Sequence, residues 1–100
     1  MVEVAVLGYG TVGAGVVNVL MTNAASIEKK VGTSVHVKYV LDLRDFPGTP
    51  VEDIVTHDFN DILNDKDVDI VVETMGGLKP AYDFTKAALQ AGKNVHQIKN

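Results

Sequence analysis

The stretch Gly8-Tyr9-Gly10-Thr11-Val12-Gly13 decides the fold of this chain. It directly follows a valine-rich apolar run at residues 2–7, and a helical pattern opens within it at about Thr11. Such a run is typical of a buried central strand, and the change of period marks the start of a helix. In this context, between a strand and a helix, the pattern G-x-G-x-x-G predicts a dinucleotide-binding unit.

Each glycine of the loop has its own predicted role. Gly8 allows the tight turn off the strand, and Gly10 lets the backbone approach a pyrophosphate. Gly13 faces the sheet, where the missing Cβ permits close packing. The first N–H groups of a helix lack internal partners and attract an anion, so no lysine is needed in the loop. The absence of Gly-Lys-Ser/Thr argues against a phosphate loop of the ATPase kind. The alternative is a helix start whose glycines serve packing alone.

The apolar positions after the loop predict one long helix over residues 11–31. Lys29 and Lys30 suit its last turn, because cations complement the helix dipole there, and Gly32 is a natural stop. The buried positions recur three or four residues apart, as in an amphipathic helix, at Gly13, Val17, Leu20, Ala24, Ile27 and Val31.

The remainder of the chain alternates between strand and helix patterns. Strands are predicted at residues 35–43, 53–57, 69–73 and 94–98, and helices at residues 59–64 and 80–91. Asp58 is the expected N-cap of the first of these helices and Pro80 opens the second. The second helix is predicted to bury Ala81, Phe84, Ala88 and Ala91. The alternation predicts an α/β fold, a Rossmann-type doubly wound parallel sheet, incomplete at four to five strands, in one domain over residues 1–100.

Two kinds of side chain compete for the adenosine end of a dinucleotide. An acidic residue at the end of the second strand normally binds the ribose, and Asp42 and Asp45 are the candidates. Arg44, between them, could instead meet a 2′-phosphate. Because Asp42 follows Gly13 at a longer interval than the usual ~20 residues, NAD and NADP both stay open.

The fourth predicted strand supplies the other wall of the site. Ligands of this fold lie where the strand order reverses, beside the first and fourth strands. The residues after the fourth strand should therefore face the cofactor, and Thr74, Gly76 and Gly77 are the candidates. Met75, between them, is interpreted as a packing residue.

Composition excludes several classes of function. The net charge of −4 and the pI near 5.1 give no reason to expect nucleic acid or an anionic membrane as a partner. The chain has no cysteine, which fits a cytoplasmic location, and no signal peptide or membrane span is predicted. His36, His57 and His96 lack metal-ligand spacing and are interpreted as solvated or hydrogen-bonded structural residues. Neither a metal site nor a catalytic residue is predicted.

The quoted segments resemble the homoserine dehydrogenase family over nearly the whole chain. Residues 8–16 read GYGTVGAGV, similar to that family's G-x-G-T-V-G-x-G-V opening, and Leu43-Arg44-Asp45 resembles its segment after the second strand. Residues 67–73 with Gly76-Gly77 are similar to its D-V-D-I-V-V-E-x-x-G-G strand, and the following helix with its A-G-K exit also matches.

The resemblance implies an oxidoreductase that interconverts L-aspartate 4-semialdehyde and L-homoserine with NAD or NADP, in threonine and methionine synthesis. It implies that Gly10, Thr11, Val12 and Gly13 hold the pyrophosphate and that Arg44 meets the adenosine end. The chain departs from the pattern at Asn100, where the family has a lysine. The catalytic domain would follow residue 100, so this chain alone is expected to bind the cofactor without turnover.

Two alternatives stay open beside this interpretation. The first is a non-enzymatic Rossmann module that senses NAD(P), and the second is a different two-domain reductase of the same architecture. The sheet is expected to expose apolar surface where further strands would pair, which favours a homodimer formed through a sheet edge.

Overall fold

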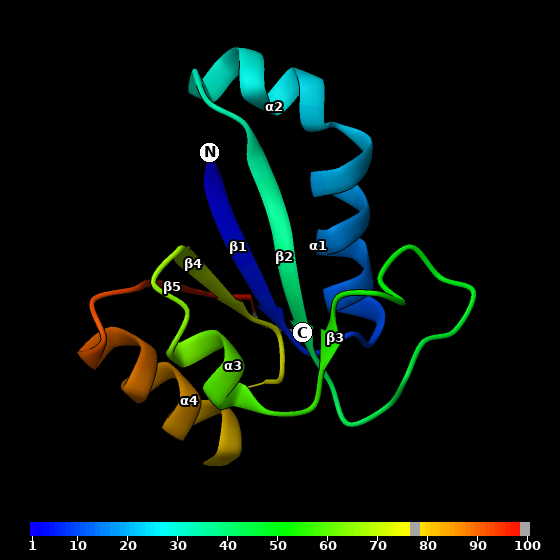
Figure 1. Cartoon of the computed structure of the whole chain (residues 1–100). Coiled ribbons are helices and arrows are strands. Elements are labelled where there is room, and N and C mark those ends of the chain that lie inside the picture. Colours follow the sequence, from blue (N-terminus) through cyan, green and yellow to red (C-terminus); the bar gives the residue numbers. More distant parts are fainter. Residues whose placement is uncertain (77–78, 99–100) are drawn as a thin grey trace.

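A five-stranded parallel sheet forms the centre of the molecule (Figure 1). The structure is a computed structural model that describes residues 1–76 and 79–98. The strands are β1 (Val2–Leu7), β2 (Val35–Leu41), β3 (Val55–Thr56), β4 (Val68–Glu73) and β5 (Asn94–Gln97). The helices are α1 (Thr11–Thr22), α2 (Ala24–Val31), α3 (Phe59–Leu63) and α4 (Lys79–Gln90).

The strand order β3-β2-β1-β4-β5 makes the sheet doubly wound. The chain first winds outward from β1 through β2 to β3, and then returns to the other side of β1 for β4 and β5. Every strand pair is parallel. The Rossmann-type fold predicted from the sequence is therefore confirmed, with the reversal of strand order between β1 and β4.

β1 packs against helices on both of its faces, because it is apolar on both. Ala5 and Leu7 enter one core, which α3 and α4 complete, and Val4 and Val6 enter another, which α1 completes. In Figure 1, α3 and α4 accordingly lie together on one side of the sheet, and α1 and α2 follow one another on the other. Packing on both faces fixes the position of β1, and with it the position at which the glycine loop leaves the strand.

The helix predicted over residues 11–31 is interrupted, so that part of the prediction was wrong. Asn23, with φ −102° and ψ 20°, separates α1 from α2. Asparagine is a weak helix former, and no residue of α2, which is fully described, is buried. The apolar spacing continues through Asn23, but the burial that would hold one straight helix does not. Gly32 ends α2 with φ +86°, as predicted.

Several element boundaries differ from the prediction by one or two residues. β2 ends at Leu41 instead of residue 43, because the two-residue strand β3 pairs only with Val40 and Leu41. Leu43 is consequently 90% exposed. Ala91, predicted to be buried, lies beyond the end of α4 and is exposed. The predicted N-cap Asp58 is confirmed, since its Oδ1 accepts a hydrogen bond from the Asn60 amide at 2.9 Å.

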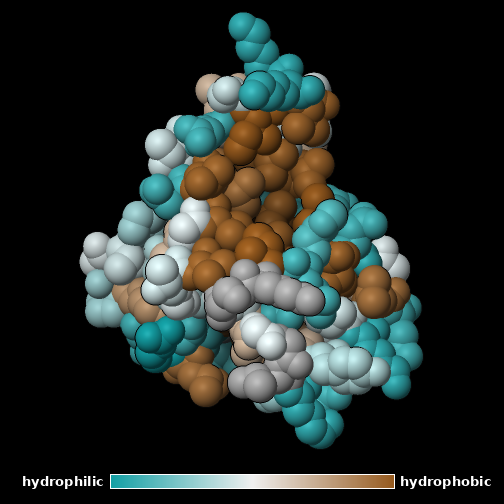
Figure 2. All heavy atoms as spheres, turned by 180° about the vertical axis from the view of Figure 1, so that it is seen from behind, coloured by the Kyte–Doolittle hydropathy of each residue, from teal (hydrophilic) through white to brown (hydrophobic). Residues whose placement is uncertain are grey.

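Apolar surface remains exposed on one side of the molecule. Figure 2, seen from behind, shows hydrophobic side chains gathered into a continuous patch. The core on the α1 side of the sheet includes apolar residues that are only partly buried, among them Val2, Val16, Leu20 and Ile70. Within residues 1–76 and 79–98, no helix is long and apolar enough to cross a membrane.

Candidate functional site

The glycine loop joins the end of β1 to the start of α1. Gly8 has φ +98°, which strongly favours glycine, and its N–H donates to the Leu41 carbonyl at 2.7 Å. Gly10 is the N-cap of α1, and its carbonyl accepts the first helical hydrogen bond, from Ala14, at 2.8 Å. This fully described helix has neither a side-chain cap nor an acidic residue in its first turn. The N–H groups of that turn are therefore available to an external anion.

Two glycines of the loop differ in what surrounds them. A Cβ on Gly13 would lie 1.9 Å from the Gly8 carbonyl oxygen and 3.0 Å from the Thr74 hydroxyl, so Gly13 is required for α1 to pack here. Among the described residues, no atom lies within 4 Å of a Cβ built on Gly10. The loop is closed behind Gly13 and open in front of Gly10, which is the arrangement that a pyrophosphate needs.

Thr74 fastens the end of β4 to this loop. Its N–H and its hydroxyl both lie within hydrogen-bond distance of the Leu7 carbonyl, at 3.1 and 2.8 Å, and the side chain is buried. The Thr74 hydroxyl is therefore hydrogen-bonded within the protein, and these two bonds fix the end of β1, where the loop begins. Gly76 is exposed, with φ +81°. Gly77, the other glycine predicted for this wall, lies outside the described residues.

Asp42 connects the glycine loop to the segment after β2. Its Oδ2 accepts from the Tyr9 amide at 2.9 Å and from Arg44 Nη2 at 3.2 Å. Its Oδ1 accepts from the Arg44 amide and from Arg44 Nε, both at 3.0 Å. Burial raises the pKa of Asp42, but the hydrogen bonds from Arg44 and Tyr9 outweigh it and hold the pKa at about 2. The carboxylate is therefore ionised, and both of its oxygens already accept hydrogen bonds from Tyr9 or Arg44.

A cavity of about 590 Å³ opens at the carboxyl ends of β1, β2 and β4. This volume lies in the range of small-molecule sites, and the cavity is placed where the strand order reverses, as ligands of this fold require. Met75, Pro80 and Phe84 supply apolar surface that the sequence analysis did not assign to the site. The full lining is Gly8, Tyr9, Gly10, Leu41, Asp42, Leu43, Arg44, His57, Thr74, Met75, Pro80 and Phe84.

His57 belongs to the same cavity, although the sequence analysis interpreted it as structural. It follows β3, and its Nε2 lies 2.9 Å from Asp45 Oδ1. Hydrogen bonding of His57 was expected, but its place beside Arg44 was not. The available signal was the edge strand before it, because parallel strands bring their carboxyl ends to one edge of the sheet.

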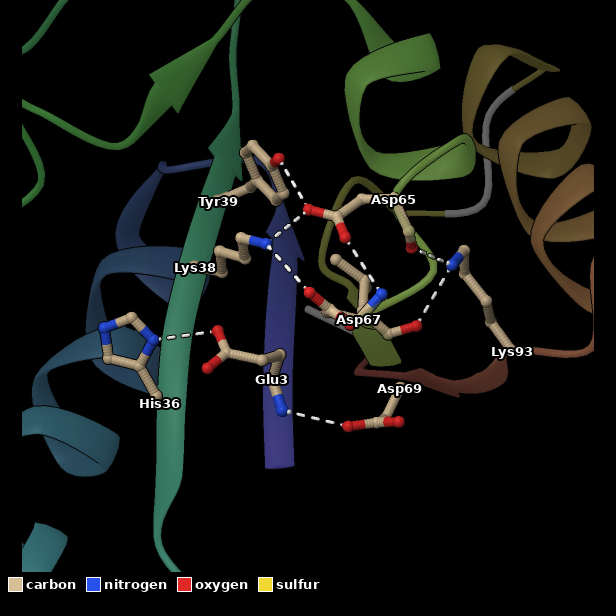
Figure 3. Close-up of polar contacts among 9 residues, drawn as sticks. Glu3, His36, Lys38, Tyr39, Asp65, Asp67, Asp69 and Lys93 are labelled. Carbon is tan, nitrogen blue, oxygen red and sulfur yellow. Dashed lines mark hydrogen bonds and ion pairs between the residues drawn. The ribbon is translucent and has the colours of Figure 1, made fainter. Parts of the chain in front are cut away.

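A separate polar cluster occupies the amino end of the sheet (Figure 3). Asp65 is its centre: its carboxylate pairs with Lys38 Nζ at 2.6 Å and accepts from the Tyr39 hydroxyl at 2.8 Å. The hydrogen bond from Lys38, followed by that from Tyr39, lowers the pKa of Asp65 to about 2. Lys93, which is buried, donates to the carbonyls of Asp65 and Val68. These contacts join the turn before β4 to β2 and β5, and we assign them to stability.

Most of the chain matches the model of a known protein family. Residues 8–97 match the family model described as the homoserine dehydrogenase NAD-binding domain. The chain belongs to this family. Its cofactor is accordingly NAD or NADP.

Relatives of this homoserine dehydrogenase domain are similar over nearly all of the chain. The homoserine dehydrogenase of Bacillus subtilis is 34% identical over 101 residues, and that of Mycobacterium tuberculosis is 37% identical over 99. In both cases the match covers 94% of this chain but only 22% of the relative. A crystal structure of S. aureus homoserine dehydrogenase superposes with a TM-score of 0.86 at 35% identity, covering 98% of this chain and 26% of that one.

The structure of this homoserine dehydrogenase domain brings together most of the predicted site residues. Five of them line the one cavity described above: Gly8, Gly10, Asp42, Arg44 and Thr74. The remaining loop residues, Thr11, Val12 and Gly13, form the first turn of α1 beside that cavity. Their contacts with a dinucleotide stay predictions, as does the role of Gly76. Asn100, the position that departs from the family's lysine, lies outside the described residues.

Proposed function

We propose that this chain is the dinucleotide-binding part of a homoserine dehydrogenase, which interconverts L-aspartate 4-semialdehyde and L-homoserine in threonine and methionine synthesis. Family membership supports the reaction class, and the open surface at Gly10, beside a cavity at the carboxyl ends of the strands, supports the binding role. The proposed unit is residues 1–100, in the cytoplasm, with the substrate domain of the complete enzyme outside this chain.

The proposed binding mode follows from the charges and shapes at the site. The N–H groups of Thr11, Val12 and Gly13, with the open backbone at Gly10, would hold the pyrophosphate without a lysine. The apolar wall would take the adenine, and Arg44 would face the adenosine end.

The domain's part in the reaction is to bind and orient. The nicotinamide, when bound, supplies the hydride. Among residues 1–76 and 79–98, no group of three or more His, Asp or Glu side chains is placed to hold a metal ion. We propose that the residues of the glycine loop and the cavity hold the dinucleotide, that the acid and base of the reaction come from the substrate domain, and that this chain alone does not turn over.

A pair of glycine substitutions tests the binding role. Gly10→Ala puts a methyl group where the pyrophosphate should approach, whereas Gly15→Ala adds a methyl group on the exposed side of α1, and neither meets a described atom within 4 Å. Calorimetric titration with NADPH and NADH should show binding to the wild type and to Gly15→Ala, and at least tenfold weaker binding to Gly10→Ala. Equal affinities for the two variants would remove the loop from the site, and no binding to the wild type would contradict the proposal.

The sensing-module alternative makes the same prediction for binding and differs in catalysis. A longer chain that continues into the substrate domain should reduce aspartate semialdehyde if the proposed function is right. A longer chain that binds the dinucleotide but never consumes it in the presence of this aldehyde would favour the sensing module.

A further inference from the structure

A buried carboxylate lies at the carboxyl end of β4, directly before the turn that faces the glycine loop. Glu73 is the last residue of β4 and is only 2% exposed. Val71, two residues earlier, belongs to the core that α3 and α4 complete, and because side chains alternate along a strand, Glu73 points to the same face. Burial of a carboxylate costs free energy unless hydrogen bonds compensate it, so its presence here requires an explanation.

The Glu73 carboxylate holds the backbone of the turn at residues 74–76. Its Oε2 accepts a hydrogen bond from the amide of Met75, two residues further along the chain. Its own carbonyl accepts from the Ile98 amide at 2.9 Å, which fixes Glu73 against the chain after β5. Glu73 is not among the described residues that line the cavity, whereas Thr74 and Met75 are. The carboxylate therefore acts on the cavity through the residues whose backbone it holds.

Two contacts connect this turn to the glycine loop. The Thr74 hydroxyl donates to the Leu7 carbonyl at 2.8 Å and lies 3.3 Å from the Gly8 carbonyl oxygen. The Met75 side chain lies beside Gly8, since a Cβ built on that glycine would come within 3.0 Å of Met75 Cγ. The turn and the glycine loop are therefore adjacent walls of one cavity, and their separation depends on how the turn is held.

The strand order determines which half of a dinucleotide meets this turn. β1 lies between β2 and β4, so the segment after β2 and the turn after β4 lie on opposite sides of the glycine loop. In the proposed binding mode the pyrophosphate lies on the loop and the adenosine end meets Arg44, which follows β2. The nicotinamide half then extends to the other side, toward Thr74 and Met75.

We propose that Glu73 is a positioning residue for the nicotinamide half of the dinucleotide. Its hydrogen bond to the Met75 amide holds the turn at residues 74–76 at the separation from the glycine loop that this half requires. The inference rests on the proposed dinucleotide site and adds to it a residue that acts without touching the ligand.

A comparison of NADH with ADP isolates the nicotinamide half, because ADP keeps the adenosine and both phosphates but lacks the nicotinamide and its ribose. Calorimetric titration of the 100-residue chain gives the ratio of the two affinities. Glu73→Met has a side chain of similar length that cannot accept the amide hydrogen bond, so the ratio should fall about fivefold, the scale of one hydrogen bond. Glu73→Gln keeps an acceptor oxygen and should retain the wild-type ratio. The affinity for ADP should not change in either variant.

Asp69→Leu is the matched control at the other end of β4. The Asp69 carboxylate also accepts from a backbone amide, that of Glu3 at 3.1 Å, so this substitution removes a comparable hydrogen bond at the amino end of the sheet (Figure 3). Its ratio should match that of the wild type. Hydrogen exchange gives a direct readout, because the Met75 amide should exchange faster in Glu73→Met than in the wild type, Glu73→Gln or Asp69→Leu.

The outcomes separate this inference from the proposed function. If the wild type binds NADH more tightly than ADP and Glu73→Met keeps the same ratio, the inference is wrong and the site stands. Equal losses in Glu73→Gln or Asp69→Leu would also overturn it, as would a parallel loss of ADP affinity in Glu73→Met, which indicates a general structural role. A wild type that binds ADP and NADH equally would show that the nicotinamide half does not meet this turn. If the wild type binds neither, the proposed function fails and takes this inference with it.

Discussion

Gly13→Ala is the substitution whose effect the structure defines most sharply. The added Cβ would lie 1.9 Å from the Gly8 carbonyl oxygen, where ordinary contacts begin at 3.4 Å. The two nearest obstacles are the carbonyl oxygen and carbon of Gly8, which are backbone atoms, so no side-chain rotation relieves the contact. α1 must move away from the end of β1 by about 1.5 Å, the difference between those two distances.

The magnitude follows from two opposing effects. Overpacking costs about 1–3 kcal/mol, and a backbone obstacle belongs at the upper end of that range. Alanine recovers about 1 kcal/mol because it is a better helix former than glycine. We expect the free energy of unfolding to fall by about 2 kcal/mol, which corresponds to a decrease in Tm of roughly 8–16 °C for a domain of this size.

Gly15→Ala is the matched control on the same helix. A Cβ there meets no described atom within 4 Å, so only the helix-propensity gain remains and Tm should rise by up to roughly 4–8 °C. Thermal and urea unfolding followed by circular dichroism measures both variants. A Gly13→Ala protein as stable as Gly15→Ala would refute the packing account of this glycine.

Two further predictions concern charged side chains. The pKa of Asp42 is held at about 2, below its ordinary value of 3.8, so its stabilising contribution is complete above that ordinary value and is lost as the pH falls toward 2. Asp42→Asn should flatten this acid-dependent part of the unfolding free energy between pH 5 and 2, and parallel curves would contradict the assignment. Lys93→Met leaves two carbonyls, those of Asp65 and Val68, without this donor and should cost about 1–3 kcal/mol. The exposed Lys66→Met control should stay within about 0.5 kcal/mol, and equal losses would show that the Lys93 bonds are not responsible.

Much of the fold could be predicted because local pattern and burial agree along most of the chain. The run through β1 is apolar on both faces, and the helices on either side of the sheet use both of them. The prediction was wrong where the apolar pattern continues but burial or strand pairing does not. The spacing through Asn23 continues without burial, and the alternation to Leu43 continues beyond the last residue that β3 can pair.

The candidate site also has a part that could be predicted from the sequence and a part that could not. The glycine loop is local, so its sequence alone indicates a turn, an open backbone and a close contact, and the geometry at Gly10 and Gly13 agrees. The place of His57 beside Arg44 depends on the register of β3 against β2, and the wall at Phe84 depends on how α4 packs. Neither is encoded within a short window of sequence, which is why the place of His57 and the apolar wall were missed.

We propose that a dinucleotide lies on the glycine loop at the carboxyl end of the sheet. Amide chemical-shift mapping with ¹⁵N-labelled protein and NADPH tests it most directly. We expect the largest changes at Gly10, Val12 and Gly13, with further changes at Arg44, and no change at Lys38 in the amino-end cluster. Saturating NADPH that leaves the loop amides unmoved, or that acts mainly at the amino end, would contradict the account.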